Sequence, residues 1–407
     1  MTGSVEVGLE GIRDARQRIH GQLVDTPCTR SLVFSDLTDG DLHFKFENFQ
    51  RTGSFKERGA LNRLHFLTAD QRRHGVVAAS AGNHAQALAY HATRLGIPVQ
   101  VVMPETTPLV KVSNTRRHGA QVLLHGTSFA EALARARELE EEGALRIDAF
   151  DDEAIIAGQG TIGMELHEQC PDLDLVLVPI GGGGLISGIA LALKSLRPSV
   201  RIVGVEAEVA ATASRSLAAG HIMEVEQGET IADGIAVKRL GERTFPLIQE
   251  LVDDVVVVDD EEIASAILLL LEREKTMVEG AGATTLAALA TDKVRPAAGD
   301  TVVGVLSGGN IDVNILSRII DRGLVRDGRL ARFVVTVRDR PGALASVTRL
   351  VADAGANVLE VSHHRAFAGL SVRDVRIVLG VETRGEDHVR EILTMLKEKG
   401  IPVEPLD

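Results

Sequence analysis

Short apolar runs typical of buried strands alternate with helical patterns from about residue 40 to 320. The strand-like runs occupy residues 75–80, 99–104, 120–124, 173–180, 200–206, 252–259 and 300–307. The helical patterns between them lie at 83–95, 108–118, 127–142, 185–196, 261–275 and 282–291. This order predicts βαβ units, in which helices cover both faces of a mainly parallel sheet. Ligands in such a fold bind beyond the carboxyl ends of the strands.

The pattern changes after a polar segment that we interpret as a linker, residues 323–330. The 407-residue chain then continues as strand, helix, strand, strand, helix and short strand. That order predicts a ferredoxin-like βαββαβ domain over 331–407. We therefore expect an α/β domain over 1–322 and a second, smaller domain after the linker.

Composition excludes several classes of partner. The net charge is −13 and the chain has no Trp and one Tyr, which argues against nucleic acid and against an acidic membrane surface. The apolar run at 266–271 is far too short to span a bilayer, and the N-terminus lacks an apolar core of signal-peptide length. We expect a cytoplasmic protein. Cys28 and Cys170 are isolated in the sequence, without CxxC or metal-ligand spacing, and we interpret them as reduced structural thiols.

The segment "RTGSFKERGA" (51–60) places a lysine where a helix is expected to begin. Ser54 and Glu57 match a capping box, with Ser54 as the N-cap and Lys56 in the first turn. The positive end of the helix dipole and partial burial both favour the neutral amine, the form that makes a Schiff base. The alternative is a solvated lysine at an ordinary helix start.

Glycine-rich segments follow two of the predicted strands. In "AASAGNHAQALA" (78–89), N–H groups at a helix start can bind a carboxylate, unless this is a plain turn. In "VPIGGGGLISGIALAL" (178–193), four glycines let N–H groups converge on a phosphate. A dinucleotide site is the rival: Gly182 and Gly184 fit G-x-G, Ser187 takes the third position, and Glu206 lies where a ribose-binding acid would be. A tight turn without a ligand also stays open.

A further strand is followed by "GVLSGGNID" (304–312). Ser307 is either the N-cap of the next helix or a donor to a ligand.

Together and in order, these segments resemble pyridoxal-phosphate enzymes of fold type II, the tryptophan-synthase β family, and within it the threonine dehydratases (threonine ammonia-lyases). The resemblance covers nearly the whole chain. It is carried by "ENFQRTGSFKERGA", "SAGNHAQ", "VMPETTPLVKV", "DDEAIIAGQGTIGMEL", "PIGGGGLISG", "ETIADGIAV", "VEGAGA" and "SGGNID". The tail resembles an ACT regulatory domain, with "VRDRPGALASV" as its first strand, loop and helix.

The resemblance implies a two-lobed domain, with the smaller lobe over about 50–148, and it implies roles for single residues. Lys56 would hold pyridoxal 5'-phosphate and act as the base at the substrate Cα, and Phe55 would pack against the cofactor ring. Asn83 would bond the phenolic oxygen and Ser307 the pyridine nitrogen. The cofactor phosphate would be held by Gly181, Gly182, Gly183, Gly184 and the amide of Leu185. The substrate carboxylate would be bound by the loop of Ser80, Ala81, Gly82, Asn83 and His84.

The implied reaction is the β-elimination of L-threonine to 2-oxobutanoate and ammonia, with L-serine as a slower substrate giving pyruvate. The alternatives are a serine or 3-hydroxyaspartate dehydratase and, outside the lyases, a dinucleotide-binding sensor of amino acids. Both isoleucine biosynthesis and threonine catabolism stay open as the pathway.

Two departures from serine racemases of the family qualify this interpretation. The position of their second base is Ala81, so dehydration should dominate over racemisation. Their cation site would leave only Glu206 and the carbonyl of Ala210, because Thr212 replaces the second acid, so we expect no metal there, or at most a weak site. The alternative is a solvated Glu206 at a strand end.

Three further residues have open roles. Glu279, in "VEGAGA", is expected either to line the active site or to serve a helix end. His363 and His364 are expected at the end of a strand in the second domain, and not as metal ligands.

In the tail, Pro341 and Gly342 lie between a strand and a helix, where N–H groups can face a small carboxylate. Together with Asn357, Gly342 forms the candidate site for an amino-acid effector. ACT domains usually pair, so we expect a homodimer or homotetramer; the alternative is that this domain only holds the oligomer together.

Overall fold

The computed structural model describes residues 7–38, 40–226, 228–364, 371 and 373–406. The chain divides into two compact units, Met1–Asp312 and Val313–Asp407. The α/β class predicted from the alternating pattern is confirmed, and each predicted strand of the first unit is present within two residues of its expected bounds.

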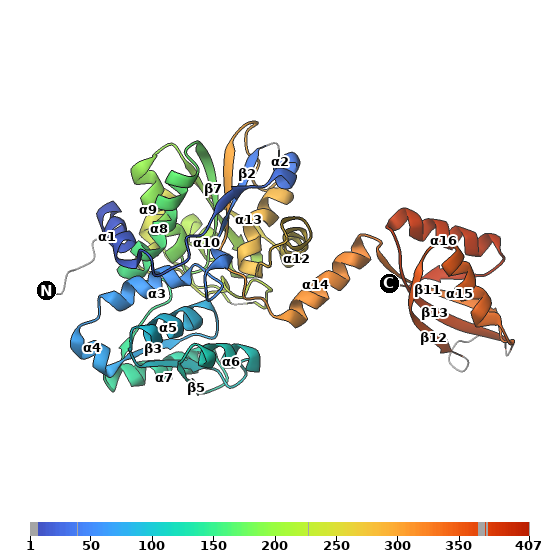
Figure 1. Cartoon of the computed structure of the whole chain (residues 1–407), viewed down its shortest axis with the longest axis horizontal. Coiled ribbons are helices and arrows are strands. Elements are labelled where there is room, and N and C mark those ends of the chain that lie inside the picture. The colour runs from blue at the N-terminus through green and yellow to red at the C-terminus, as the bar shows by residue number, and fades with distance from the viewer. Residues whose placement is uncertain (1–6, 39, 227, 365–370, 372, 407) are drawn as a thin grey trace. The chain divides into compact units, whose positions relative to one another are not determined.

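The larger sheet of the first unit has six strands in the order β1-β2-β10-β7-β8-β9. Their bounds are β1 (Cys28–Arg30), β2 (Asp41–Phe46), β7 (Leu173–Pro179), β8 (Arg201–Ala207), β9 (Asp254–Val258) and β10 (Thr301–Leu306). All neighbours are parallel except β1, which pairs with β2 in antiparallel register. Helices α8 (Glu153–Gln169) and α9 (Gly184–Leu196) lie on one side of the sheet, and α12 (Asp260–Leu269) and α13 (Gly280–Ala290) on the other (Figure 1).

The second sheet is parallel throughout, in the order β5-β4-β3-β6, and lies inside the predicted small lobe. Its strands are β3 (Val76–Ala79), β4 (Val99–Met103), β5 (Gln121–Leu124) and β6 (Leu145–Arg146). Alternate residues of β3 and β4 face opposite sides. Val76 and Val101 pack with α5 (Asn83–Arg94) and α6 (Leu109–Arg117), whereas Val77 and Val102 pack against α7 (Phe129–Glu141).

The remaining elements of the first unit connect or flank these sheets. The α-helices are α1 (Leu9–Ile19), α2 (Leu32–Thr38), α3 (Lys56–His65), α4 (Ala69–His74), α10 (Thr212–Ala219) and α11 (Thr244–Leu251). The short turns are 3₁₀ at Glu47–Phe49 and Glu208–Ala210, and a π-type end to α12 at Leu270–Glu274. Within the part of the chain that the structure describes, no helix is long and apolar enough to cross a membrane.

The second unit contains the predicted βαββαβ order. Its antiparallel sheet runs β12-β13-β11-β14, and its apolar core joins that sheet to two helices. The bounds are β11 (Leu330–Arg338), α15 (Ala343–Asp353), β12 (Asn357–His364), β13 (Asp374–Glu382), α16 (Glu386–Glu398) and β14 (Val403–Pro405). His363 and His364 lie at the end of β12, as predicted.

The stretch predicted as a linker, 323–330, is more regular than expected. Helix α14 (Val313–Arg326) runs into it, and β11 begins at Leu330. The helix extends this far because Leu316, Ile319 and Gly323 recur at helical spacing and are all buried.

Candidate active site

The segment before α3 lies against the loop that follows β10. The N–H of Phe55 donates to the carbonyl of Ser307 at 3.0 Å, and the N–H of Gly309 donates to the carbonyl of Gly53 at 2.8 Å. Ser54 and Gly308 form a single antiparallel bridge between these contacts. Lys56, the next residue, is thereby fixed beside the carboxyl end of β10.

Lys56 lies in the first turn of α3, as predicted from the sequence, and is the first residue of that helix. Its ammonium donates to the carbonyl of Ala149 at 2.8 Å and lies 5.0 Å from the ring centroid of Phe55. Burial lowers the pKa of Lys56 to about 8, although Asp148 and Glu279 act in the opposite direction. A sizeable fraction of the amine is therefore neutral near pH 8, as a nucleophilic lysine requires.

The predicted capping box is wrong. The helix begins after Phe55 and has no side-chain cap, and the hydroxyl of Ser54 is buried without a hydrogen-bond partner. Glu57 instead accepts from the N–H of Thr52 and bonds Nε2 of His91 at 2.9 Å. The backbone of Ser54 pairs with the loop after β10, so it is not available for the N-cap conformation.

The glycine loop after β7 leads directly into α9. Gly183 has φ 95°, a conformation that favours glycine, and is the N-cap of α9. A Cβ on Gly182 would lie 2.3 Å from the ring of Phe150, and one on Gly184 would lie 2.9 Å from the carbonyl of that residue. The Thr244 hydroxyl donates to the carbonyl of Gly182 at 2.7 Å and holds the turn. The first N–H groups of α9 have no partner inside the helix, so this end is a candidate anion-binding cradle.

The glycine loop and Lys56 both contact one short segment, residues 149–150. Ala149 accepts the hydrogen bond from Lys56, and Phe150, the next residue, packs against Gly182 and Gly184. An anion at the start of α9 and a group attached to Lys56 therefore share one region of the first unit.

Asn83 is the first residue of α5 and is held by two side chains. Its Nδ2 donates to Oε1 of Glu279 at 2.7 Å, and its Oδ1 accepts from Nδ2 of Asn310 at 2.7 Å. Asn310 was not assigned a role from the sequence, although it lies inside the quoted "SGGNID". Its position could have been inferred only from the pairing of the loop after β10 with Thr52, whose carbonyl also accepts from Nδ2 of Asn310.

Glu279 fills both of the roles left open for it. Its backbone is the N-cap of α13, and its buried carboxyl accepts from Asn83 and from the N–H of Asn310. Burial first, and the charge of Asp233 next, raise the pKa of Glu279 to about 7. The site thus contains an acid that changes its charge near neutral pH.

The Ser80–His84 loop ends at the start of α5, where the first N–H groups again lack partners inside the helix. The hydroxyl of Ser80 accepts from the N–H of Gly82 at 3.3 Å. The side chain of His84 is buried, with Nε2 3.1 Å from the carbonyl of Ile147. Burial lowers the pKa of His84 to about 4, so its imidazole is neutral at pH 7.

Ser307 is buried at the carboxyl end of β10. It is not a helix N-cap, because α14 begins at Val313. Among the residues that the structure describes, its hydroxyl makes no hydrogen bond, although its carbonyl accepts from Phe55. The hydroxyls of Ser307 and Ser54 are therefore both available close to Lys56.

Comparison with known proteins decides the family. The profile of the family described as "Pyridoxal-phosphate dependent enzyme" matches residues 19–308, which include the whole site. The chain belongs to the pyridoxal-phosphate dependent enzymes. The profile of the "ACT domain" matches residues 331–399.

Proteins similar to this pyridoxal-phosphate enzyme over nearly its full length include two named L-threonine ammonia-lyase. The one from Thermotoga maritima is 46% identical, covering 98% of this chain and 99% of that protein. The one from Geobacter sulfurreducens is 48% identical, covering 97% of this chain and 98% of that protein. Among solved structures, maize serine racemase is 38% identical with a TM-score of 0.74, covering 78% of this chain and 98% of that one.

The dinucleotide alternative is wrong, both by family and by geometry. Ser187, the third position of the dinucleotide pattern, donates its hydroxyl to the carbonyl of Thr244. Glu206, the supposed ribose acid, is fully buried and accepts from the N–H groups of Ala213 and Ser214 at 2.6 and 2.9 Å.

The same contacts show that the other alternative for Glu206, a solvated side chain at a strand end, is wrong. Its carboxylate caps the start of α10, where the hydroxyls of Thr212 and Ser214 also donate to it. Burial nonetheless raises the pKa of Glu206. The second candidate ligand, the carbonyl of Ala210, belongs to a buried residue in the 3₁₀ turn before this helix. Both oxygens of the carboxylate are thus already hydrogen-bonded to the protein.

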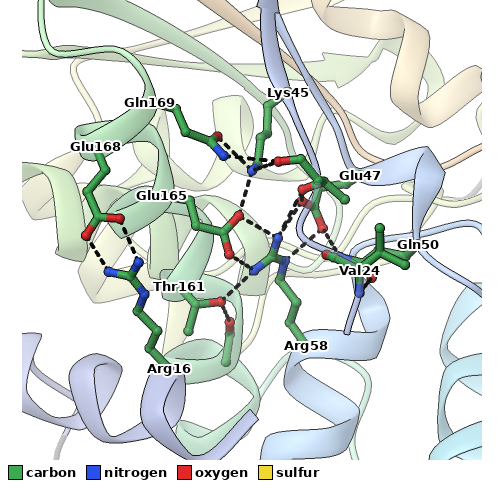
Figure 2. Close-up of polar contacts among 12 residues, drawn as sticks. Arg16, Val24, Lys45, Glu47, Gln50, Arg58, Thr161, Glu165, Glu168 and Gln169 are labelled. Carbon is green, nitrogen blue, oxygen red and sulfur yellow. Dashed lines mark hydrogen bonds and ion pairs between the residues drawn. The ribbon is translucent and has the colours of Figure 1, made fainter. Parts of the chain in front are cut away.

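A buried network of charged side chains holds α3 against neighbouring elements (Figure 2). The sequence did not indicate this network. Arg58, two residues after Lys56, bonds Glu47 through two nitrogens at 2.7 and 2.8 Å and Glu165 at 2.5 and 2.8 Å. Lys45 donates to the same Glu165 at 2.6 Å. Because Glu165 is on α8 and Lys45 on β2, this network fixes the first turn of α3 against the sheet and its covering helix.

The two cysteines are not isolated in the fold. The sulfur atoms of Cys28 and Cys170 lie 3.3 Å apart, and both residues are free thiols. The pairing joins residues separated by 142 positions, so nothing in the local sequence could indicate it.

The two candidate effector residues, Gly342 and Asn357, lie at the starts of two different elements of the second unit. Gly342 has φ 88°, is the N-cap of α15, and has open space where a Cβ would lie. Asn357 opens β12, and its Nδ2 donates to Oε2 of Glu382 at 3.3 Å.

Proposed function

We propose that this pyridoxal-phosphate enzyme is a threonine ammonia-lyase, which converts L-threonine to 2-oxobutanoate and ammonia and acts more slowly on L-serine. The single observation that carries the proposal is a lysine with a pKa lowered to about 8 at a helix start, beside an anion cradle. Similarity to two proteins named L-threonine ammonia-lyase over nearly the whole chain supports the substrate.

Lys56 has two roles in this proposal. It holds the cofactor, and its amine, once released, takes the proton from the substrate Cα. Bound pyridoxal phosphate supplies an electron sink for that step. The short path from Lys56 through Ala149 and Phe150 to the glycine loop suits a cofactor anchored at both ends. Phe55 lies next to the Lys56 ammonium and is placed to pack against the ring.

The anion sites are assigned to two helix starts. Gly181–Gly184 and the amide of Leu185 hold the cofactor phosphate at the start of α9. The Ser80–His84 loop binds the substrate carboxylate at the start of α5. Each helix has at least twelve residues, so its dipole favours an anion at this end.

Ser307 is assigned to the pyridine nitrogen and Asn83 to the phenolic oxygen. The Ser307 hydroxyl is free of other partners among the described residues, and the Nδ2 of Asn83 is oriented by Glu279. A hydroxyl cannot stabilise a protonated pyridine as a carboxylate can, so the cofactor is a weaker sink. With Ser307 at this position, the bound cofactor would favour β-elimination over transamination.

The test of function is a steady-state survey of L-threonine, L-serine and 3-hydroxyaspartate, with the 2-oxo acid and ammonia measured. The highest kcat/KM is expected for threonine, and a higher value for serine or 3-hydroxyaspartate would replace this proposal with the corresponding dehydratase. The serine reaction is also analysed for D-serine, because maize serine racemase is similar in structure. Little D-serine is expected, since Ala81 offers no second base.

The test of the site is mass spectrometry after borohydride reduction, which should place a pyridoxyl group on Lys56. Lys45 and Lys111 serve as internal controls, because they are bound to Glu165 and Asp233. Lys56→Ala should lower turnover by at least about 100-fold, since it removes the base. A label on either control lysine would contradict the assignment.

The ACT domain belongs to the proposal as a sensor of an amino acid, with Gly342 and Asn357 at the site. We assign the catalytic domain to residues 1–322 and the ACT domain to 331–407, and place the protein in the cytoplasm as a homodimer or homotetramer. The match of an ACT profile to residues 331–399 supports a regulatory role.

A further inference from the structure

Three side chains with metal-binding atoms meet at one edge of the six-stranded sheet. Cys28 is on the edge strand β1, His43 is on its neighbour β2, and Cys170 directly follows α8. Cys28 pairs with Lys45, two residues from His43, so the side chains of Cys28 and His43 lie on the same face of the sheet. None of the three belongs to the site around Lys56.

Lys45 explains why the end of α8 lies over this face. Its buried ammonium donates to the carbonyl of Thr26 at 2.7 Å, to Glu165 at 2.6 Å and to Oε1 of Gln169 at 3.0 Å (Figure 2). Gln169 is the last residue of α8, so these bonds hold Cys170 against β1 and β2.

The distances suit a small tetrahedral ion. The sulfur atoms of Cys28 and Cys170 are 3.3 Å apart, Sγ of Cys170 is 3.9 Å from Nδ1 of His43, and all three ligand atoms lie within 4.8 Å of one another. With zinc bonds of about 2.3 Å to sulfur and 2.0–2.1 Å to nitrogen, tetrahedral ligands are roughly 3.5–3.8 Å apart. Shifts of a few tenths of an ångström to about one would therefore complete three corners.

His43 is oriented as a ligand would be. Its Nε2 lies 3.4 Å from Oδ2 of Asp41, which also pairs with Arg30, while Nδ1 faces the thiols. A carboxylate on the far nitrogen is the usual outer support of a metal-bound imidazole. Two thiols alone could form a disulfide. A disulfide would not account for the position of His43 beside them, whereas a shared metal ion would.

We propose that Cys28, His43 and Cys170 bind a thiophilic divalent cation, with Zn²⁺ as the best fit. Two sulfur ligands and one imidazole favour zinc over magnesium or calcium. Each thiol releases its proton to solvent on binding, and the two thiolates balance the charge of the ion. The fourth position is left for water. The bound ion links β1 to the end of α8 and stabilises that edge of the sheet.

The experiment uses the full-length protein with its cofactor, loaded with Zn²⁺ and dialysed against metal-free buffer. Zinc is counted by mass spectrometry, and affinity is measured by competition with a chromophoric chelator. The variants are His43→Gln and Asp41→Asn, with His221→Gln as the matched control, because His221 is exposed and, among the described residues, bonds the carbonyl of Ala219. Unchanged visible absorption of the bound cofactor shows that each variant is folded.

One zinc per chain is expected in the wild type and in His221→Gln. Affinity should fall at least about 10-fold in His43→Gln and about 10–100-fold in Asp41→Asn. At the same zinc concentration, the Tm should rise more in the wild type than in His43→Gln. Equal zinc retention by the wild type and His43→Gln overturns the proposal. So does a titration in which oxidised glutathione converts Cys28 and Cys170 to a disulfide equally fast with and without Zn²⁺.

Discussion

Ser307 is a residue of the candidate site at which a single substitution should change the chemistry directly. Its hydroxyl is buried and, among the described residues, has no protein partner, whereas its carbonyl is tied to Phe55. A substitution that keeps the backbone therefore alters only what the hydroxyl offers to a ligand.

Ser307→Ala should lower kcat/KM for threonine by about 5–150-fold, the loss of one hydrogen bond of about 1–3 kcal/mol. The cofactor should stay bound through Lys56 and the glycine loop, as its visible absorption would report. Ser307→Asp should raise side transamination, measured as pyridoxamine phosphate. An unchanged product ratio in that variant would count against the weak-sink argument.

Glu279 makes the stability of the site depend on pH. Its pKa is raised from 4.5 to about 7 because the carboxyl is buried. The protonated form is favoured in the folded state, so this stabilisation is complete below pH 4.5 and is lost as pH rises through 7.

Glu279→Gln should remove that dependence. Between pH 4.5 and pH 8 the wild type should lose about 3 kcal/mol of unfolding free energy relative to the variant. Urea unfolding of cofactor-free protein at both pH values measures the difference. The matched control is Glu208→Gln at an exposed position, which should follow the wild type. Parallel pH profiles for wild type and Glu279→Gln would show that the carboxyl is not a buried acid.

At the scale of elements, the helix α3 depends on charges that the sequence did not reveal. Arg58 is almost completely buried between Glu47 and Glu165. The neighbouring pair of Arg16 and Glu168 (Figure 2) is partly exposed, with 37% and 52% of the side chains accessible. Both arginines bond carboxylates through two nitrogens, and the two sites differ in burial, so their variants can be compared.

Arg58→Ala should destabilise the protein by about 3–5 kcal/mol, because it leaves Glu47 buried without its partner. Arg16→Ala should cost about 1 kcal/mol or less, since exposed pairs contribute little. Chemical denaturation of both variants gives the comparison. Lys56 should also lose reactivity toward the cofactor in Arg58→Ala, because the start of α3 is no longer fixed. Equal costs for the two variants would mean that the buried network does not hold α3.

The sequence predicted those strands whose residues are buried on both faces of the sheet. The strands β3, β4, β7 and β10 are largely buried and are mostly apolar in the sequence, with Gln100 in β4 and Asp174 in β7 as polar exceptions. The strand β1 has three residues, none of them fully buried, and gave no such pattern. The capping box at Ser54 failed for another reason: its backbone pairs with Gly308, more than 250 residues away, and tertiary contact overrides the local motif.

In the candidate site, too, residues in local motifs could be predicted from the sequence, and residues placed by tertiary contacts could not. Lys56, Asn83, the glycine loop and Ser307 could be proposed from the sequence because they belong to local motifs, and their roles stay predictions. Glu279 was assigned only as one of two possibilities, and Asn310 not at all, because their roles arise from contacts between loops. The pairing of Cys28 with Cys170 likewise depends on how α8 is held over β2.

At the scale of the whole molecule, two family profiles in one chain raise the question of coupling between them. The pyridoxal-phosphate profile covers 19–308 and the ACT profile 331–399. Gly342, at the start of α15, leaves space for a ligand, and the N–H groups of that helix start are suited to a carboxylate.

An amino acid bound there should change the apparent affinity for threonine by about 5–150-fold, a coupling of about 1–3 kcal/mol. Isoleucine and valine are the first ligands to measure, by calorimetry alongside threonine saturation curves. Gly342→Asp should abolish the effect, because it places a carboxylate against the ligand and strains a residue at φ 88°. The control is Gly400→Asp, which also has a positive φ and open space but lies after α16. If no branched-chain or hydroxy amino acid binds, and removal of 331–407 changes only the number of subunits, the domain serves assembly and not sensing.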